Sequence, residues 1–495
     1  MNHEVATSKH EKQTNCCIAL YSGQFIGDHS FTKRLEKSDR EYLVRSVRKG
    51  VGEAGQCSWF VLPSSPSSSV CVLGLGKKED WTARKLVLAA RKLFSHLKGN
   101  DTRSITLSLD DFRPRTLSLE RTAEVVATNL EMAQYEFNRF KEKPKDGWFE
   151  VQSISYEVKD ASKKKSISKA LFTGKSIGVH VNAARELANT PGGTMTPVLL
   201  AREAKNRGEK CGVKVTVLNE AEMKKLGMHA ILAVSKGSSE EAQFIIMEYL
   251  KGPKSQKPIV FVGKGITFDS GGLHLKPGNA MDDMHLDMSG GAATIGALCA
   301  IAELGLKTNV IGLIAAVENM PSGESYRPGD ILTSMSGKTI EVVSPDAEGR
   351  VTLADALWYA RRYNPRLVVD VATLTGACII ALGHHASALF SPQDQTAAML
   401  SKAGEECGDY LWRMPLWEEY ECGLKGVFGD VLNAPKNREA GSINAALFLY
   451  QWAKDFPAWA HIDIASTMTS ASDDNLAKGS TGSATRLFIE VARTF

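Results

Sequence analysis

Short and continuously apolar runs alternate with helix-like segments along the C-terminal two-thirds of this 495-residue chain, and this alternation constrains the fold most. Residues 258–262, 309–317 and 367–372 form such runs, and we expect them to be buried strands. Residues 290–304 and 352–362 are predicted to be helices. Apolar strands separated by helices are typical of a largely parallel sheet with helices on both faces. Ligands of such sheets bind outside the carboxyl ends of the strands.

The first third of the chain has an alternation of its own. Residues 17–21, 59–62 and 70–75 are strand-like, and residues 80–97 and 119–140 carry helical spacing of apolar residues. These elements predict an α/β domain of roughly 150 residues.

A Lys- and Ser-rich stretch at residues 141–169 is predicted to be a linker, and a helix should follow at residues 177–187. The sequence therefore predicts an α/β protein of two domains. These are a smaller N-terminal α/β domain at residues 1–160, a linker and connecting helix at 161–190, and a larger C-terminal α/β domain with a mostly parallel sheet at 191–495.

The composition is that of an ordinary globular protein, with 43% hydrophobic and 23% charged residues and a net charge of +4. So mild a basic excess does not by itself argue for binding to nucleic acid. The first fifteen residues lack the apolar core of a secretory signal, and no apolar run approaches the length of a membrane span. The nine irregularly spaced cysteines fit a reducing cytoplasm better than a disulfide framework, so we expect a cytoplasmic protein without a membrane segment.

Two compact segments, rich in glycine and apolar residues, hold seven charged side chains. Charge beside core-like sequence is costly unless something compensates it, and two divalent cations would balance four carboxylates. Buried ion pairs in a structural network are the alternative for any one residue, but the clustering of all seven favours a two-metal site. The seven are Lys264, Asp269, Lys276, Asp287, Asp346, Glu348 and Arg350.

The three basic residues of this set have different expected roles. A lysine beside two dications is pushed toward its neutral amine, which can ligate a metal, and Lys264 is the candidate. Lys276 and Arg350 could stay charged and stabilise an oxyanion or bind a small anion.

Both segments carry a specific resemblance. Val-Gly-Lys-Gly-Ile-Thr-Phe-Asp-Ser-Gly-Gly at 262–272 and Asp-Ala-Glu-Gly-Arg at 346–350 resemble the hallmark segments of the leucyl (cytosol) aminopeptidases, the M17 metallopeptidase family. The likeness extends through Val-Glu-Asn-Met-Pro-Ser-Gly at 317–323 and Ala-Thr-Leu-Thr-Gly-Ala at 372–377. It covers about the C-terminal two-thirds of the chain and implies that the C-terminal domain is catalytic.

The resemblance implies a ligand set for two metal ions, Mn²⁺ or Zn²⁺. One ion would be held by Lys264, Asp269, Asp287 and Glu348, and the other by Asp269, Asp346 and Glu348. A water between the ions would attack the first peptide carbonyl, which Lys276 and a metal would polarise. A bicarbonate at Arg350 would act as general base.

The resemblance also implies an apolar pocket for the N-terminal residue of a peptide, with Leu or another apolar residue preferred. Its predicted lining is Met284, Thr373, Gly376, Ala465 and Met468. The family assembles as hexamers whose active sites face an interior cavity, so a homo-hexamer acting on short peptides is expected.

Two positions depart from the family pattern. Ser344-Pro345 replaces the usual Asn-Thr before Asp346, and Pro345 removes an amide donor and fixes its φ angle. His285 lies where a longer basic residue is common. Neither change removes a ligand, so rate and specificity are affected more than activity.

Other functions are less well supported. Gly-Leu-Gly-Lys-Lys at 74–78 lacks the third glycine of a dinucleotide loop, and Ser270 lacks the pattern of a serine nucleophile. A DNA-binding role on the same scaffold stays possible because of the lysines at 141–169, but it is not expected. A catalytically inactive assembly protein conflicts with the intact ligand set.

Overall fold

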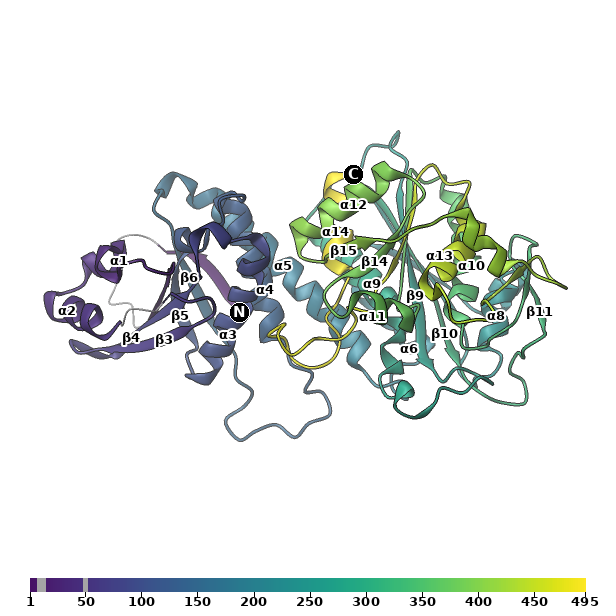
Figure 1. Ribbon diagram of the computed structural model, residues 1–495, viewed down its shortest axis with the longest axis horizontal. Coiled ribbons are helices and arrows are strands. Elements are labelled where there is room, and N and C mark those ends of the chain that lie inside the picture. Colours follow the sequence, from purple (N-terminus) through teal and green to yellow (C-terminus); the bar gives the residue numbers. More distant parts are fainter. Residues whose placement is uncertain (7–14, 48–51) are drawn as a thin grey trace. The chain divides into compact units, whose positions relative to one another are not determined.

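The computed structural model describes residues 1–6, 15–47 and 52–495. The chain forms two compact units (Figure 1). The first unit is Met1–Val179 with Ala471–Ala477, and the second is His180–Ser470 with Lys478–Phe495. The division falls inside one helix, α5 (Lys164–Asn189). The predicted α/β class with a smaller N-terminal and a larger C-terminal domain is confirmed.

The first unit is built on a six-stranded sheet in the order β1-β6-β5-β2-β4-β3. All neighbouring strands are parallel except the edge pair β3 and β4. The strands are β1 (Asn2–Val5), β2 (Asn15–Leu20), β3 (Cys57–Leu62), β4 (Ser65–Gly74), β5 (Ser104–Ser108) and β6 (Ser153–Glu157). The helices are α1 (Ser30–Arg34), α2 (Lys37–Ser46), α3 (Ala83–Gly99) and α4 (Leu119–Gln134).

Alternation along β2 explains why both faces of this sheet are covered. Cys17 and Ala19 pack with α3 and α4, whereas Cys16 and Ile18 pack on the opposite face with Leu43 of α2. Successive side chains of a strand point to opposite faces, so an apolar strand requires cover on both.

The predicted linker at residues 141–169 is wrong in its second half. It contains β6, which lies inside the sheet between β1 and β5, and it also contains the start of α5. Only Ile154 and Tyr156 of β6 are buried, and the lysine-rich flanks hide so short an alternation. The helix predicted over residues 119–140 ends earlier, at Gln134.

The second unit is built on an eight-stranded sheet in the order β15-β14-β17-β13-β9-β10-β8-β7. Its four central strands, β17 to β10, are mutually parallel. The strands are β7 (Lys214–Leu218), β8 (Gln243–Leu250), β9 (Ile259–Asp269), β10 (Asn309–Asn319), β13 (Leu367–Ala372), β14 (Ser387–Phe390), β15 (Leu411–Arg413) and β17 (Trp459–Asp463). A small second sheet joins β11 (Ile331–Thr333), β12 (Thr339–Glu341) and β16 (Val431–Leu432).

Helices cover both faces of the central sheet (Figure 1). On one face Val260 and Val262 of β9 pack into a core shared with α8, α10 and α13. On the other face Phe261 stacks on Phe488 of α14, which packs against α9. The helices are α6 (Pro197–Cys211), α7 (Glu220–Lys225), α8 (His229–Ser235), α9 (Ser289–Glu303), α10 (Glu348–Ala360), α11 (Gly376–Leu382), α12 (Asp394–Cys407), α13 (Gly441–Ala453) and α14 (Thr485–Thr494).

In the part of the chain that the structure describes, none of the helices has the length and apolar character needed to cross a bilayer.

Candidate metal centre

The carboxyl ends of the four central strands meet at one edge of the sheet. Asp269 is the last residue of β9, Asn319 ends β10, Asp463 ends β17, and Thr373 follows directly after β13. Lys264 lies earlier on β9, paired with Ala315 of β10. The sequence predicted that the functional residues would lie at this edge, where parallel sheets bind their ligands.

The other charged residues come from three segments that reach this edge. Asp287 lies on a 3-10 turn (Met284–Met288) that leads directly into α9. Asp346 lies in the loop before α10, Glu348 is the first residue of that helix, and Arg350 lies in its first turn. Lys276 lies in the loop after β9.

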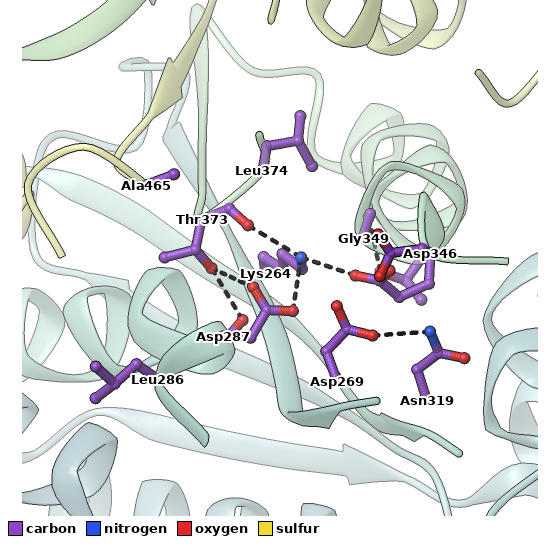
Figure 2. A network of polar contacts seen from close by, with 12 residues as sticks. Lys264, Asp269, Leu286, Asp287, Asn319, Asp346, Gly349, Thr373, Leu374 and Ala465 are labelled. Carbon is purple, nitrogen blue, oxygen red and sulfur yellow. Dashed lines mark hydrogen bonds and ion pairs between the residues drawn. The ribbon is translucent and has the colours of Figure 1, made fainter. Parts of the chain in front are cut away.

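Lys264 joins three of these elements through one ammonium group. Its Nζ lies 2.7 Å from Asp287 Oδ2 and 2.8 Å from Glu348 Oε1, and it donates to the carbonyl oxygen of Thr373 at 3.0 Å (Figure 2). The Lys264 side chain is only 3% exposed. A buried charge needs such complete pairing.

Lys276 forms the second pair of ion contacts. Its Nζ lies 2.8 Å from Asp269 Oδ2 and 2.6 Å from Asp346 Oδ1. At 14% exposure it is more open to solvent than Lys264. Each lysine thus pairs with two of the four carboxylates. Lys264 does so from the buried side of the cluster and Lys276 from the side more open to solvent.

The carboxylates form a set that fits divalent cations. Oxygens of Asp269, Asp346 and Glu348 all lie within 4.8 Å of one another. Oε2 of Glu348 is buried and has no hydrogen-bond partner among the described residues. Burial and the neighbouring Glu348 raise the pKa of Asp269, and burial likewise raises the pKa values of Asp287 and Asp346. Hard cations would satisfy the free oxygen and hold these groups ionised.

The lysine pKa values follow from the same environment. Burial alone would lower the pKa of Lys264, but Asp287 and Glu348 raise it above the ordinary lysine value. Burial opposes the charge of Lys276 in the same way, and Asp269 and Glu348 raise its pKa. The neutral Lys264 predicted from sequence therefore requires cations to replace its carboxylate partners.

Neighbouring polar side chains fix the carboxylates. The Thr373 hydroxyl donates to Asp287 Oδ1 at 2.6 Å, and Asn319 Nδ2 donates to Asp269 Oδ1 at 2.8 Å (Figure 2). The same Asn319 nitrogen donates to the Pro345 carbonyl at 3.0 Å. Asp463 accepts from the Leu374 amide at 3.0 Å and from the Thr375 hydroxyl at 2.6 Å, which holds the loop after β13.

Sequence reasoning assigned no role to Asn319 or Asp463. Both end strands at the functional edge, and that position was the one available signal.

Arg350 is buried beside this cluster. Its Nη1 donates to the Asn433 carbonyl at 3.0 Å, while its Nε is buried without a hydrogen-bond partner in the described ranges. Burial lowers its pKa to about 10, which leaves the guanidinium charged at neutral pH.

The structure shows what surrounds the two positions, Ser344-Pro345 and His285, that depart from the family pattern. The Pro345 carbonyl accepts from the Tyr326 hydroxyl at 2.7 Å as well as from Asn319, so side chains hold the loop that lacks an amide donor. His285 is half-buried, and burial lowers its pKa.

The predicted pocket residues come from three segments. Met284 begins the turn that carries Asp287, Thr373 contacts Asp287, and Gly376 begins α11. Ala465 is buried and Met468 half-buried in the segment after β17. Thr373 therefore orients Asp287, a predicted metal ligand, as well as being predicted to line the pocket.

Comparison with known proteins gives a family for both domains. The profile described as the cytosol aminopeptidase family, catalytic domain, matches residues 182–489, and that family's N-terminal domain matches residues 32–144.

A probable cytosol aminopeptidase of Methylobacillus flagellatus is 41% identical, with 99% of this chain and 98% of the relative covered. One of Nitrosococcus oceani is 38% identical, covering 97% and 96%. Among solved structures, the bottromycin maturation enzyme BotP in complex with Mn is similar with a TM-score of 0.85 and 30% identity, covering 97% of this chain and 99% of that one. The chain therefore belongs to the cytosol aminopeptidase (M17) family of metal-dependent peptide hydrolases.

Proposed function

We propose that this aminopeptidase uses two divalent ions, Mn²⁺ or Zn²⁺, to remove the N-terminal residue from peptides. The observation that carries this proposal is the convergence of four carboxylates and two lysines at the carboxyl edge of the sheet. In this arrangement Glu348 Oε2 has no partner among the described residues, and burial raises the pKa values of Asp269, Asp287 and Asp346. Cations would give the Glu348 oxygen a partner and would stabilise the ionised form of the three buried aspartates.

The ligands divide between the two ions. Lys264, Asp269, Asp287 and Glu348 would hold one ion, and Asp269, Asp346 and Glu348 the other, with help from the backbone carbonyl of Asp346. Such ions lower the pKa of an attacking water and polarise the scissile carbonyl. Thr373 and Asn319 keep Asp287 and Asp269 oriented through the hydrogen bonds described above.

Lys276 and Arg350 have distinct tasks. Lys276 approaches the carboxylates from the more open side, so it is suited to donate a hydrogen bond to the carbonyl oxygen of a bound peptide. The buried Nε of Arg350 has no hydrogen-bond partner among the residues described, and the guanidinium is charged at neutral pH. Arg350 would therefore bind a small anion such as bicarbonate, and that anion would act as the general base.

Substrate selection follows from the pocket and the free amine. The free α-amine of a peptide would bind at the metal centre, which would restrict the reaction to the first residue. Met284, Thr373, Gly376, Ala465 and Met468 would line a pocket that prefers Leu or another apolar side chain.

We also infer a homo-hexamer in the cytoplasm. Several apolar side chains of the second unit are exposed, among them Ile380 at 89% and Phe428 at 86%, and contact between copies would cover them. The nine cysteines are all free thiols, which suits a reducing compartment.

Hydrolysis of an amide-linked leucine reporter tests the proposal. The protein loaded with Mn²⁺ or Zn²⁺ should release leucine, and a chelator should abolish the release. Asp346→Ala should lower kcat by at least ~100-fold because it removes a ligand of one ion. The control Asp394→Ala, at a side chain that is 91% exposed, should keep wild-type activity.

A metal-loaded protein that shifts DNA at physiological salt but releases no leucine contradicts the proposed function.

A further inference from the structure

Asn433 is a buried polar residue that no sequence motif distinguishes. It follows β16 directly and is 0% exposed. Its side-chain Oδ1 accepts from the amides of Val343 at 2.7 Å and Ser344 at 3.1 Å, and its Nδ2 donates to the Ser344 carbonyl at 2.6 Å. One amide group therefore makes three bonds to the backbone that leads into Asp346.

The backbone of Asn433 is engaged at the same time. Its amide donates to the Glu341 carbonyl at 3.0 Å, at the end of β12. Its carbonyl accepts from Arg350 Nη1 at 3.0 Å. Asn433 thus contacts Arg350 and the Asp346 loop directly, and these groups have different proposed tasks.

The loop depends on such contacts because of its sequence. Pro345 lies between Ser344 and Asp346 and has no amide to donate. Its carbonyl is held by the side chains of Asn319 and Tyr326, and the two residues before it are held by Asn433. Beside the backbone bond from the Ala347 amide to the Ser344 carbonyl at 3.1 Å, side chains therefore supply the hydrogen bonds that fix this loop.

We propose that Asn433 is a positioning residue that fixes the loop of Asp346 and the guanidinium of Arg350 relative to each other. The inference rests on the proposed two-metal function and extends it to a residue that touches neither ion. Groups that orient metal ligands typically contribute 10- to 100-fold in metal affinity or activity, and about that range is expected here.

The test is Mn²⁺ affinity of the metal-free full-length protein, measured by titration and separately from turnover. Asn433→Ala should weaken Mn²⁺ binding by roughly 10- to 100-fold. The variant keeps the backbone carbonyl that accepts from Arg350, but without the three side-chain bonds this carbonyl is no longer fixed to the Asp346 loop, so the bicarbonate concentration needed for half-maximal activity should also rise. Asn433→Asp keeps an oxygen for the two loop amides but loses the donor to the Ser344 carbonyl, so it should restore only part of the affinity. If Asn433→Ala does not fold, Asn433→Ser provides the same comparison against Asn433→Asp.

Asn444→Ala is the matched control, because Asn444 is also a buried asparagine, but its side chain donates to the Glu439 carbonyl, outside the Asp346 loop. It should keep wild-type Mn²⁺ affinity. Unchanged affinity and unchanged bicarbonate dependence in Asn433→Ala, with only a lower melting temperature, overturn the inference. A wild-type protein that neither binds Mn²⁺ nor releases leucine overturns the proposed function itself.

Discussion

At the scale of single residues, the centre depends on how closely α10 approaches β9. A Cβ atom added at Gly349 would lie 2.6 Å from Nζ of Lys264. Glycine at this position therefore lets the ammonium reach Asp287 and Glu348. The glycine of Asp-Ala-Glu-Gly-Arg has a local role that its charged neighbours conceal in the sequence.

Gly349→Ala should leave the protein folded but much less active. The added methyl displaces the flexible end of Lys264 and not backbone, so the ion pairs break while the helix persists. We expect kcat to fall roughly 100-fold, in line with the cost of misplacing a reactive group by about 1 Å. Steady-state kinetics and thermal unfolding measured together check this outcome.

Gly193→Ala is the control, since nothing lies within 4 Å of a Cβ placed there. Equal activity of Gly349→Ala and wild type would show that Lys264 does not need its position.

Prediction from the sequence succeeded unevenly at this scale. The charged residues stand out because acidic and basic side chains among glycines and apolar residues demand compensation. Asn319, Asn433 and Asp463 act through ordinary hydrogen bonds to backbone and side chains, and a single polar residue leaves no pattern in one sequence. The roles of the ions and of bicarbonate stay predictions.

At the scale of elements, α10 is fixed to its neighbours through a second buried carboxylate. Asp355 accepts from the amides of Ala230 and Ile231, at the start of α8, and from the amide of Met335. It is 0% exposed, and burial raises its pKa to about 7 although the three amide bonds lower it. The helix that begins with Glu348 is therefore anchored at its middle.

This anchor makes stability depend on pH. An acid with a folded pKa near 7 and an ordinary value of 3.8 binds more protons in the folded state between these limits. The contribution of Asp355 to the free energy of unfolding is therefore full below about pH 4. It is lost as the pH rises to about 7, a change on the order of 4 kcal/mol.

The melting temperature of wild type should fall relative to that of Asp355→Asn as the pH rises from about 4 to 7, because only wild type carries the titrating group. A difference that stays constant across this range would mean that Asp355 titrates below it. Buffers of equal ionic strength are required, because salt alters the other charges.

The elements themselves were predicted best where they are apolar and long. β9, β10 and β13 are continuous apolar runs, and their place at the centre of a covered parallel sheet follows from that property. β6 was missed because two buried residues among serines do not distinguish a strand from a loop. Strand order and the mixed direction of the edge strands depend on packing between distant segments and were not predicted.

At the scale of the whole molecule, exposed apolar side chains of the second unit favour assembly. Phe428→Asp should shift the protein toward smaller species in sedimentation velocity, because a charge cannot be buried unpaired between copies. Phe140→Asp, at a residue of the first unit that is 60% exposed, is the matched control. A wild type that sediments as a monomer at micromolar concentration contradicts the hexamer.

The proposed function requires the carboxylates at the sheet edge to hold two ions. The most direct measurement is the number of Mn²⁺ ions bound per chain at saturation, determined by elemental analysis after removal of free metal. We predict two ions per chain in the wild type and fewer in Asp346→Ala, which loses a ligand of one ion. One ion or none in fully loaded wild-type protein would contradict the account.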